Sequence, residues 1–120
     1  MSCILRISAK NLDDCLSRIT MKPYRVERGT AHFEVSRSDF DNFSGQLSDA
    51  IAFLHINAPD IKRVMSEVDA NGVLDFAVEW GDAAFQSNNF PVGLVREAGN
   101  LGLALEVSHY PVAAKSGDAA

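Results

Sequence analysis

The chain of 120 residues is poor in cysteine, in basic residues and in long apolar runs, and each shortage excludes a class of protein. Two cysteines, Cys3 and Cys15, are too few for the disulfide framework of a small secreted domain. Eleven Lys and Arg against sixteen Asp and Glu argue against a nucleic-acid partner, because phosphate affinity comes from clustered cations. No run approaches the roughly 20 apolar residues of a membrane span, and no signal peptide is evident. We therefore expect a cytoplasmic protein without a membrane or nucleic-acid partner.

The motifs of the common enzyme and cofactor classes are missing as well. The sequence has no glycine-rich nucleotide loop, no His-Glu-x-x-His metal motif and no Gly-x-Ser-x-Gly nucleophile motif. Cys15 lies on the apolar stripe of its predicted helix, which is a poor setting for a reactive thiolate. We therefore expect no cofactor and no metal, and we assign no catalytic residue. The balance favours a non-enzymatic protein, with a small enzyme as the alternative.

Two periodicities predict the secondary structure, because apolar residues alternate in strands and recur at i, i+3, i+4 and i+7 in helices. The alternation predicts strands over residues 3–8, 24–27, 30–36, 73–80 and 103–110. The helical spacing predicts helices over residues 12–19, 38–68 and 91–101. We expect a hairpin turn at Arg28-Gly29, a short return strand around Phe85, and Ser38 as the N-cap of the long helix. Pro59 predicts that this segment is either a helix pair or one kinked helix.

The order of these segments predicts one domain of the α+β class. Strands that alternate, rather than being apolar throughout, favour a mostly antiparallel sheet with one covered face. Helices packed on that face make a two-layer sandwich related to the ferredoxin-like plan. We expect residues 1–111 to form this single domain and residues 112–120 to form a mobile C-terminal tail.

The two ends of the chain resemble a family of small bacterial domains of unknown function. The resemblance is carried by residues 3–8 with Asn11-Leu12-Asp13, by Pro23 to Gly29, and by the segment from Leu94 through Gly102 to Tyr110. It covers about half of the chain and its motifs are structural. It supports the α+β architecture and implies no catalytic residue.

The strand alternation also gathers charged side chains on the sheet face opposite the helices. If the parities hold, that polar and mostly acidic face holds Arg6, Arg25, Glu27, His32, Glu34, Asp75, Glu79 and Glu106. From these residues and the aromatic strand ends we select as candidate binding residues Arg25, His32, Glu34, Asp75, Glu79, Trp80 and Glu106. A solvated polar surface is the plainer interpretation of the same pattern, because surface ion pairs are common and weak.

Three functional hypotheses follow from this face. The first is a non-enzymatic protein-binding module, regulatory or immunity-like, because an acidic surface can select a basic partner. The second is a small enzyme or ligand-binding domain that uses His32 with nearby acids, or a pocket near Trp80. The third is a structural homodimer in which edge strands pair across a two-fold axis.

Overall fold

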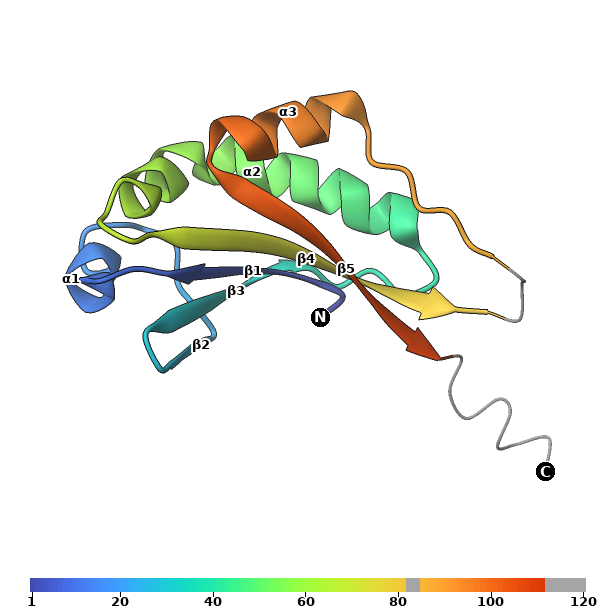
Figure 1. Ribbon diagram of the computed structural model, residues 1–120, viewed down its shortest axis with the longest axis horizontal. Helices are drawn as coiled ribbons and strands as arrows, with labels where there is room; N and C mark the ends of the chain where they lie inside the picture. The colour runs from blue at the N-terminus through green and yellow to red at the C-terminus, as the bar shows by residue number, and fades with distance from the viewer. Residues whose placement is uncertain (82–84, 112–120) are drawn as a thin grey trace.

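The computed structural model describes residues 1–81 and 85–111 of the chain, so the predicted tail 112–120 lies outside the described residues. It confirms the predicted α+β sandwich, with one five-stranded sheet and helices packed on it (Figure 1). The elements in chain order are β1 (Cys3–Ser8), α1 (Leu12–Leu16), β2 (Arg25–Glu27), β3 (Thr30–Ser36), α2 (Phe43–Met65), β4 (Asn71–Trp80), α3 (Val92–Asn100) and β5 (Leu103–Pro111).

The strands lie in the order β2-β3-β1-β4-β5. Three neighbouring pairs, β2 with β3, β3 with β1, and β1 with β4, are antiparallel, whereas β4 and β5 are parallel. The segment from β1 to β4 follows the β-α-β-β-α-β sequence of the ferredoxin-like plan. Helix α3 and strand β5 extend it by one parallel β-α-β unit at the β4 edge. In Figure 1, α2 and α3 lie on the same side of the sheet.

Successive strand residues point to opposite faces of the sheet, so the apolar residues of each strand share one face. The helices cover that face, and the hydrophobic core lies between them and the sheet. Three phenylalanines from different segments, Phe43, Phe76 and Phe90, pack with ring centroids 5.2–5.8 Å apart. The buried apolar residues of the described chain come from every element except β2: Cys3, Leu5, Ile7, Leu12, Cys15, Ile19, Met21, Ala31, Phe33, Ala50, Leu54, Ile61, Val64, Leu74, Phe76, Val78, Leu94, Ala98, Leu101 and Leu103.

The long segment that contains Pro59 forms one helix, α2, rather than a helix pair. The predicted N-cap, Ser38, is wrong: the helix is capped by Asn42, whose side chain accepts a hydrogen bond from the backbone of Gly45 at 3.0 Å. The Ser38 hydroxyl instead donates to Asp49 at 3.2 Å. The four residues that precede Asn42 are therefore free to lie along the end of β4, where the carbonyl of Phe40 accepts from the backbone N–H of Glu79 at 3.1 Å.

The predicted hairpin is confirmed, and its turn has the expected chemistry. Arg28 and Gly29 both have positive φ, 53° and 77°, as a two-residue turn that matches the twist of the strands requires. Further along β3 the pairing with β1 shifts, so that Cys3 pairs with Ser36 while Ile4 pairs with Glu34. This irregularity turns the Ser36 hydroxyl toward α2, where it donates to Asp49 at 2.6 Å.

The connection between β4 and α3 differs from the prediction. Residues 85–90 form no strand, so the return strand around Phe85 is wrong, and the expected turn at Gly81-Asp82 lies partly outside the described residues. Phe90 packs into the core in its place. No helix within residues 1–81 and 85–111 is long and apolar enough to cross a membrane.

Candidate functional site

The open face of the sheet, opposite α2 and α3, holds six of the seven residues selected from the sequence. Cross-strand partners point to the same face, so the register places two rows of side chains across the sheet. One row runs Arg25, His32, Arg6, and the next runs Glu34, Ile4, Asp75, Glu106. Glu79 follows on β4, opposite Tyr110.

Trp80 is the residue that the structure separates from the others. It follows Glu79 in β4 and therefore points to the opposite face of the sheet. Its ring contacts His109 edge-on, with centroids 5.2 Å apart, and 40% of the residue is exposed. A hollow of about 310 Å³ near the end of β4 includes Phe40, Glu79 and Gln86, but Trp80 is not among its lining residues.

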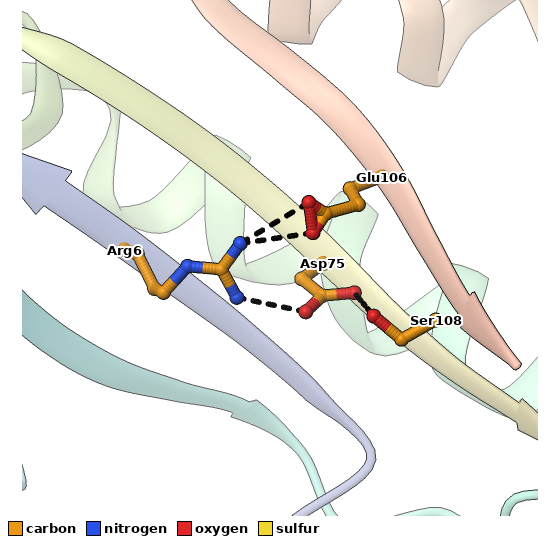
Figure 2. A network of polar contacts seen from close by, with 4 residues as sticks. All are labelled: Arg6, Asp75, Glu106 and Ser108. Carbon is orange, nitrogen blue, oxygen red and sulfur yellow. Dashed lines mark hydrogen bonds and ion pairs between the residues drawn. The ribbon is translucent and has the colours of Figure 1, made fainter. Parts of the chain in front are cut away.

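A four-residue network occupies the centre of the open face (Figure 2). The guanidinium of Arg6 donates to Asp75 at 2.7 Å and to the two carboxylate oxygens of Glu106 at 3.0 and 3.4 Å. The Ser108 hydroxyl donates to the other oxygen of Asp75 at 2.8 Å. Burial lowers the pKa of Arg6, but the hydrogen bonds to Asp75 and Glu106 outweigh it, and the net shift is upward. Arg6 is therefore a fixed positive charge held by three strands.

The network is more buried than an ordinary surface ion pair. Only 27% of the Arg6 side chain and 13% of the Asp75 side chain are exposed, against 45% for Glu106. An ion pair in such a setting loses less of its energy to solvent screening than a fully exposed pair does. The centre of the open face therefore holds its charged side chains in a fixed arrangement.

His32 lies beside this network but does not form an acid–base pair with a carboxylate. The residue is 9% exposed, its ring lies 6.0 Å from that of Tyr24, and Nδ1 has no hydrogen-bond partner. Burial, then the charges of Arg25 and Arg6, lower the pKa of His32, while Glu27 acts in the opposite direction. His32 is therefore neutral near pH 7. No hydrogen bond joins it to a carboxylate within the part of the chain that the structure describes, so the second hypothesis gains no catalytic geometry here.

The remaining charges of the face are largely compensated within it. Arg25 pairs with Glu27 at 3.4 Å, and Arg37 pairs with Glu34 at 2.7 Å. Among the described residues, Glu79 forms no ion pair. The face thus carries five carboxylates against three guanidinium groups, including Arg37. It is only mildly acidic, and its least compensated carboxylate lies at the end of β4.

An aromatic pair lies beside that carboxylate. The rings of Phe40 and Tyr110 are 5.4 Å apart, and the two residues are 38% and 47% exposed. Tyr110 is the cross-strand partner of Glu79, and the backbone of Phe40 bonds to Glu79. Sequence reasoning missed Phe40 because it placed this residue in the long helix. The position of Tyr110 could have been predicted, because Glu106, Ser108 and Tyr110 alternate along the last strand and therefore point to the same, open face.

Neither the two cysteines nor any metal-binding cluster of the described residues offers a second site. Burial, followed by the charges of Asp75 and Asp49, raises the pKa of the Cys3 thiol, and burial also raises that of Cys15. Neither thiol is therefore an activated nucleophile. Within residues 1–81 and 85–111, no group of three or more His, Cys, Asp or Glu side chains is placed to hold a metal ion.

Comparisons of the chain with protein-family models, with curated proteins and with solved structures found no match. The resemblance of the two ends to a bacterial domain family therefore stays a prediction.

Proposed function

We propose that the protein is a non-enzymatic binding module that recognises a protein partner through the open face of its sheet. The observation that carries this proposal is the exposed aromatic pair Phe40–Tyr110 beside the carboxylate of Glu79, which forms no ion pair within residues 1–81 and 85–111. Aromatic side chains are enriched at the centres of protein interfaces, where they bury a large area at a small entropic cost.

The charges of the face specify the kind of partner. Five carboxylates against three guanidinium groups favour a partner whose surface is positively charged, because complementary charge speeds association and rejects wrong partners. The hydrogen bonds of Arg6 hold Asp75 and Glu106 in fixed positions. Such a preorganised surface loses little side-chain freedom on binding.

A regulatory or immunity-like role fits this description, with the domain covering a basic surface of another protein. This finer assignment rests on analogy with other small acidic domains, because a fold does not determine a function.

The test starts with the tagged chain as bait in native lysate at low and at high salt. The partner retained at low salt is then purified, and its dissociation constant is measured for the wild type and two variants. Tyr110→Ala removes half of the aromatic pair, and we expect it to weaken binding about 30-fold, the loss typical of an interface hot spot. The control is Ile56→Ala, which removes a 73% exposed apolar side chain from α2, on the other side of the sheet, and should leave affinity within about twofold.

Two outcomes would overturn the proposal. One is recovery of the bait without any stoichiometric partner at either salt concentration. The other is a captured partner whose affinity is the same for Tyr110→Ala and the wild type. Thermal unfolding of both variants verifies that each is folded before its affinity is compared.

A further inference from the structure

The two edge strands of the sheet differ in how they are protected against pairing with another strand. Strand β2 has only three residues, of which Arg25 and Glu27 are charged, and it ends at a tight turn. Short, charged edges of this kind are the usual defence against further pairing. Strand β5 has nine residues, and no backbone of the described residues bonds to its outer edge.

The side chains of β5 add little protection. The strand contains no Lys or Arg, and its single acid, Glu106, is drawn across the sheet face by Arg6 at 3.0 Å. Its one proline, Pro111, is its last residue. The outer N–H and C=O groups of the strand are therefore available to a further strand along most of its length.

An apolar stripe on α3 lies beside this open edge. Val92 is 70% exposed and Val95 is 47% exposed, and Gly99 completes the stripe at helical spacing. The other two sides of α3 face the sheet and α2. Its buried side chains, Leu94 and Ala98, face the sheet. The groove toward α2 is lined by Ala58, Lys62, Gly93, Arg96, Glu97, Asn100 and Leu101. The stripe therefore lies on the side of α3 that is turned away from α2, beyond β5.

We propose that β5 and the α3 stripe form a dimer interface with a second copy of this chain. A two-fold axis perpendicular to the sheet pairs β5 with its counterpart in antiparallel orientation and makes one continuous sheet from the two copies. It also brings the two α3 helices together in antiparallel orientation. An alignment of the two helices that places Val92 of each copy opposite the small Gly99 of the other lets one stripe fit the other.

The charges along β5 are compatible with a second copy. Cross-strand partners must point to the same face of the sheet. At the two-fold axis a residue of β5 therefore pairs with the same residue of the other copy, and not with the residue next to it. A register centred on Leu105 or on Val107 places Glu106 opposite Ala104 or Ser108 of the other copy. Neither partner is charged. Only the register centred on Glu106 itself opposes two carboxylates, which disfavours it.

This interface is separate from the open face used in the proposed function. The dimer would leave both open faces uncovered on the same side of the extended sheet. Its test uses the purified chain alone, so its failure would not affect the proposed binding role.

The experiment is sedimentation equilibrium on the wild type, on the double variant Val92→Glu with Val95→Glu, and on a matched control. The control is Ile56→Glu with Val68→Glu, which places the same charges at residues that are 73% and 64% exposed on other segments. We expect a wild-type mass of twice the chain and the same mass for the control. For the α3 variant we expect a dimer dissociation constant at least about 100-fold higher, so that the variant sediments largely as a monomer. Circular dichroism verifies that all three are folded.

Hydrogen exchange supplies a second measurement that does not depend on a substitution. Backbone amides on the outer edge of β5 should exchange more slowly as the concentration of wild-type protein rises, because the second strand covers them. A monomeric wild type would overturn the proposal, as would an α3 variant that dimerises like the control. Exchange in β5 that is independent of concentration in a dimeric sample would place the interface elsewhere and overturn it equally.

Discussion

The two faces of the sheet are built by the same strands but are stabilised by different kinds of interaction. Leu5, Leu74 and Phe76 are fully buried against the helices, while Arg6 and Asp75, one residue further along β1 and β4, meet on the open face. The covered face is stabilised by the burial of apolar surface, whose free energy is large and depends on the buried area more than on the identity of the neighbouring residue. The open face is held by directed contacts whose energy is smaller but which fix charges in place. The comparison shows that the residues of the core and the residues that hold the charges in place are one step apart along each strand.

Removing a side chain from the covered face should have the largest effect. Phe76 is fully buried and contacts Phe43 and Phe90, so Phe76→Ala leaves a cavity between β4, α2 and the segment that precedes α3. We expect the free energy of unfolding to fall by about 3–5 kcal/mol, as for other buried phenylalanines. Urea denaturation followed by circular dichroism measures it. A loss of less than about 1 kcal/mol would mean that this face is not the core of the domain.

Disrupting the Arg6 network should have a smaller effect. Arg6→Ala leaves the carboxylate of Asp75, 13% exposed, without its cation, and we expect a loss of about 1–3 kcal/mol. A double-mutant cycle with Asp75→Ala should give a coupling of about 1 kcal/mol between the two side chains. The same cycle on Arg37 and Glu34, where Arg37 is 81% exposed, is the control and should give no more than about 0.5 kcal/mol. Equal couplings would show that the central network is no different from a surface ion pair.

The smallest effect should be a pH dependence from His32. Burial and the charges of Arg25 and Arg6 lower the folded-state pKa of His32 below its ordinary value of 6.5. The unfolded chain therefore binds a proton at a higher pH than the folded chain does, and stability is lost as the pH falls below about 6.5. Urea midpoints of the wild type should decrease between about pH 7 and pH 5 more steeply than those of His32→Gln. Parallel curves for the two proteins would contradict this assignment.

Much of the fold follows from the sequence because its dominant signals are local. The alternation of Leu74, Phe76 and Val78 specifies both a strand and its covered face, and Arg28-Gly29 specifies a turn that needs positive φ. Six of the seven candidate residues lie on the open face for the same reason.

What the sequence did not predict depends on contacts between distant segments. Asn42 and Ser38 are equally good helix caps by type, and only the contact of Ser38 with Asp49 and of Phe40 with Tyr110 places the helix start at Phe43. The shift of pairing beside Ser36 is another such case. The compensation of charges was hidden as well, because an alternation pattern shows which face a carboxylate occupies but not which arginine reaches it.

The measurement that tests the separation of the two faces most directly is the salt dependence of partner affinity for two charge reversals. Glu79→Lys reverses the charge at the end of β4 on the open face, and Lys62→Glu makes the opposite change on α2, over the covered face. The proposed role predicts that Glu79→Lys weakens binding at least about tenfold at low salt and less at high salt, with Lys62→Glu close to wild type at both. Equal effects of the two reversals, or a loss confined to Lys62→Glu, would contradict recognition through the open face.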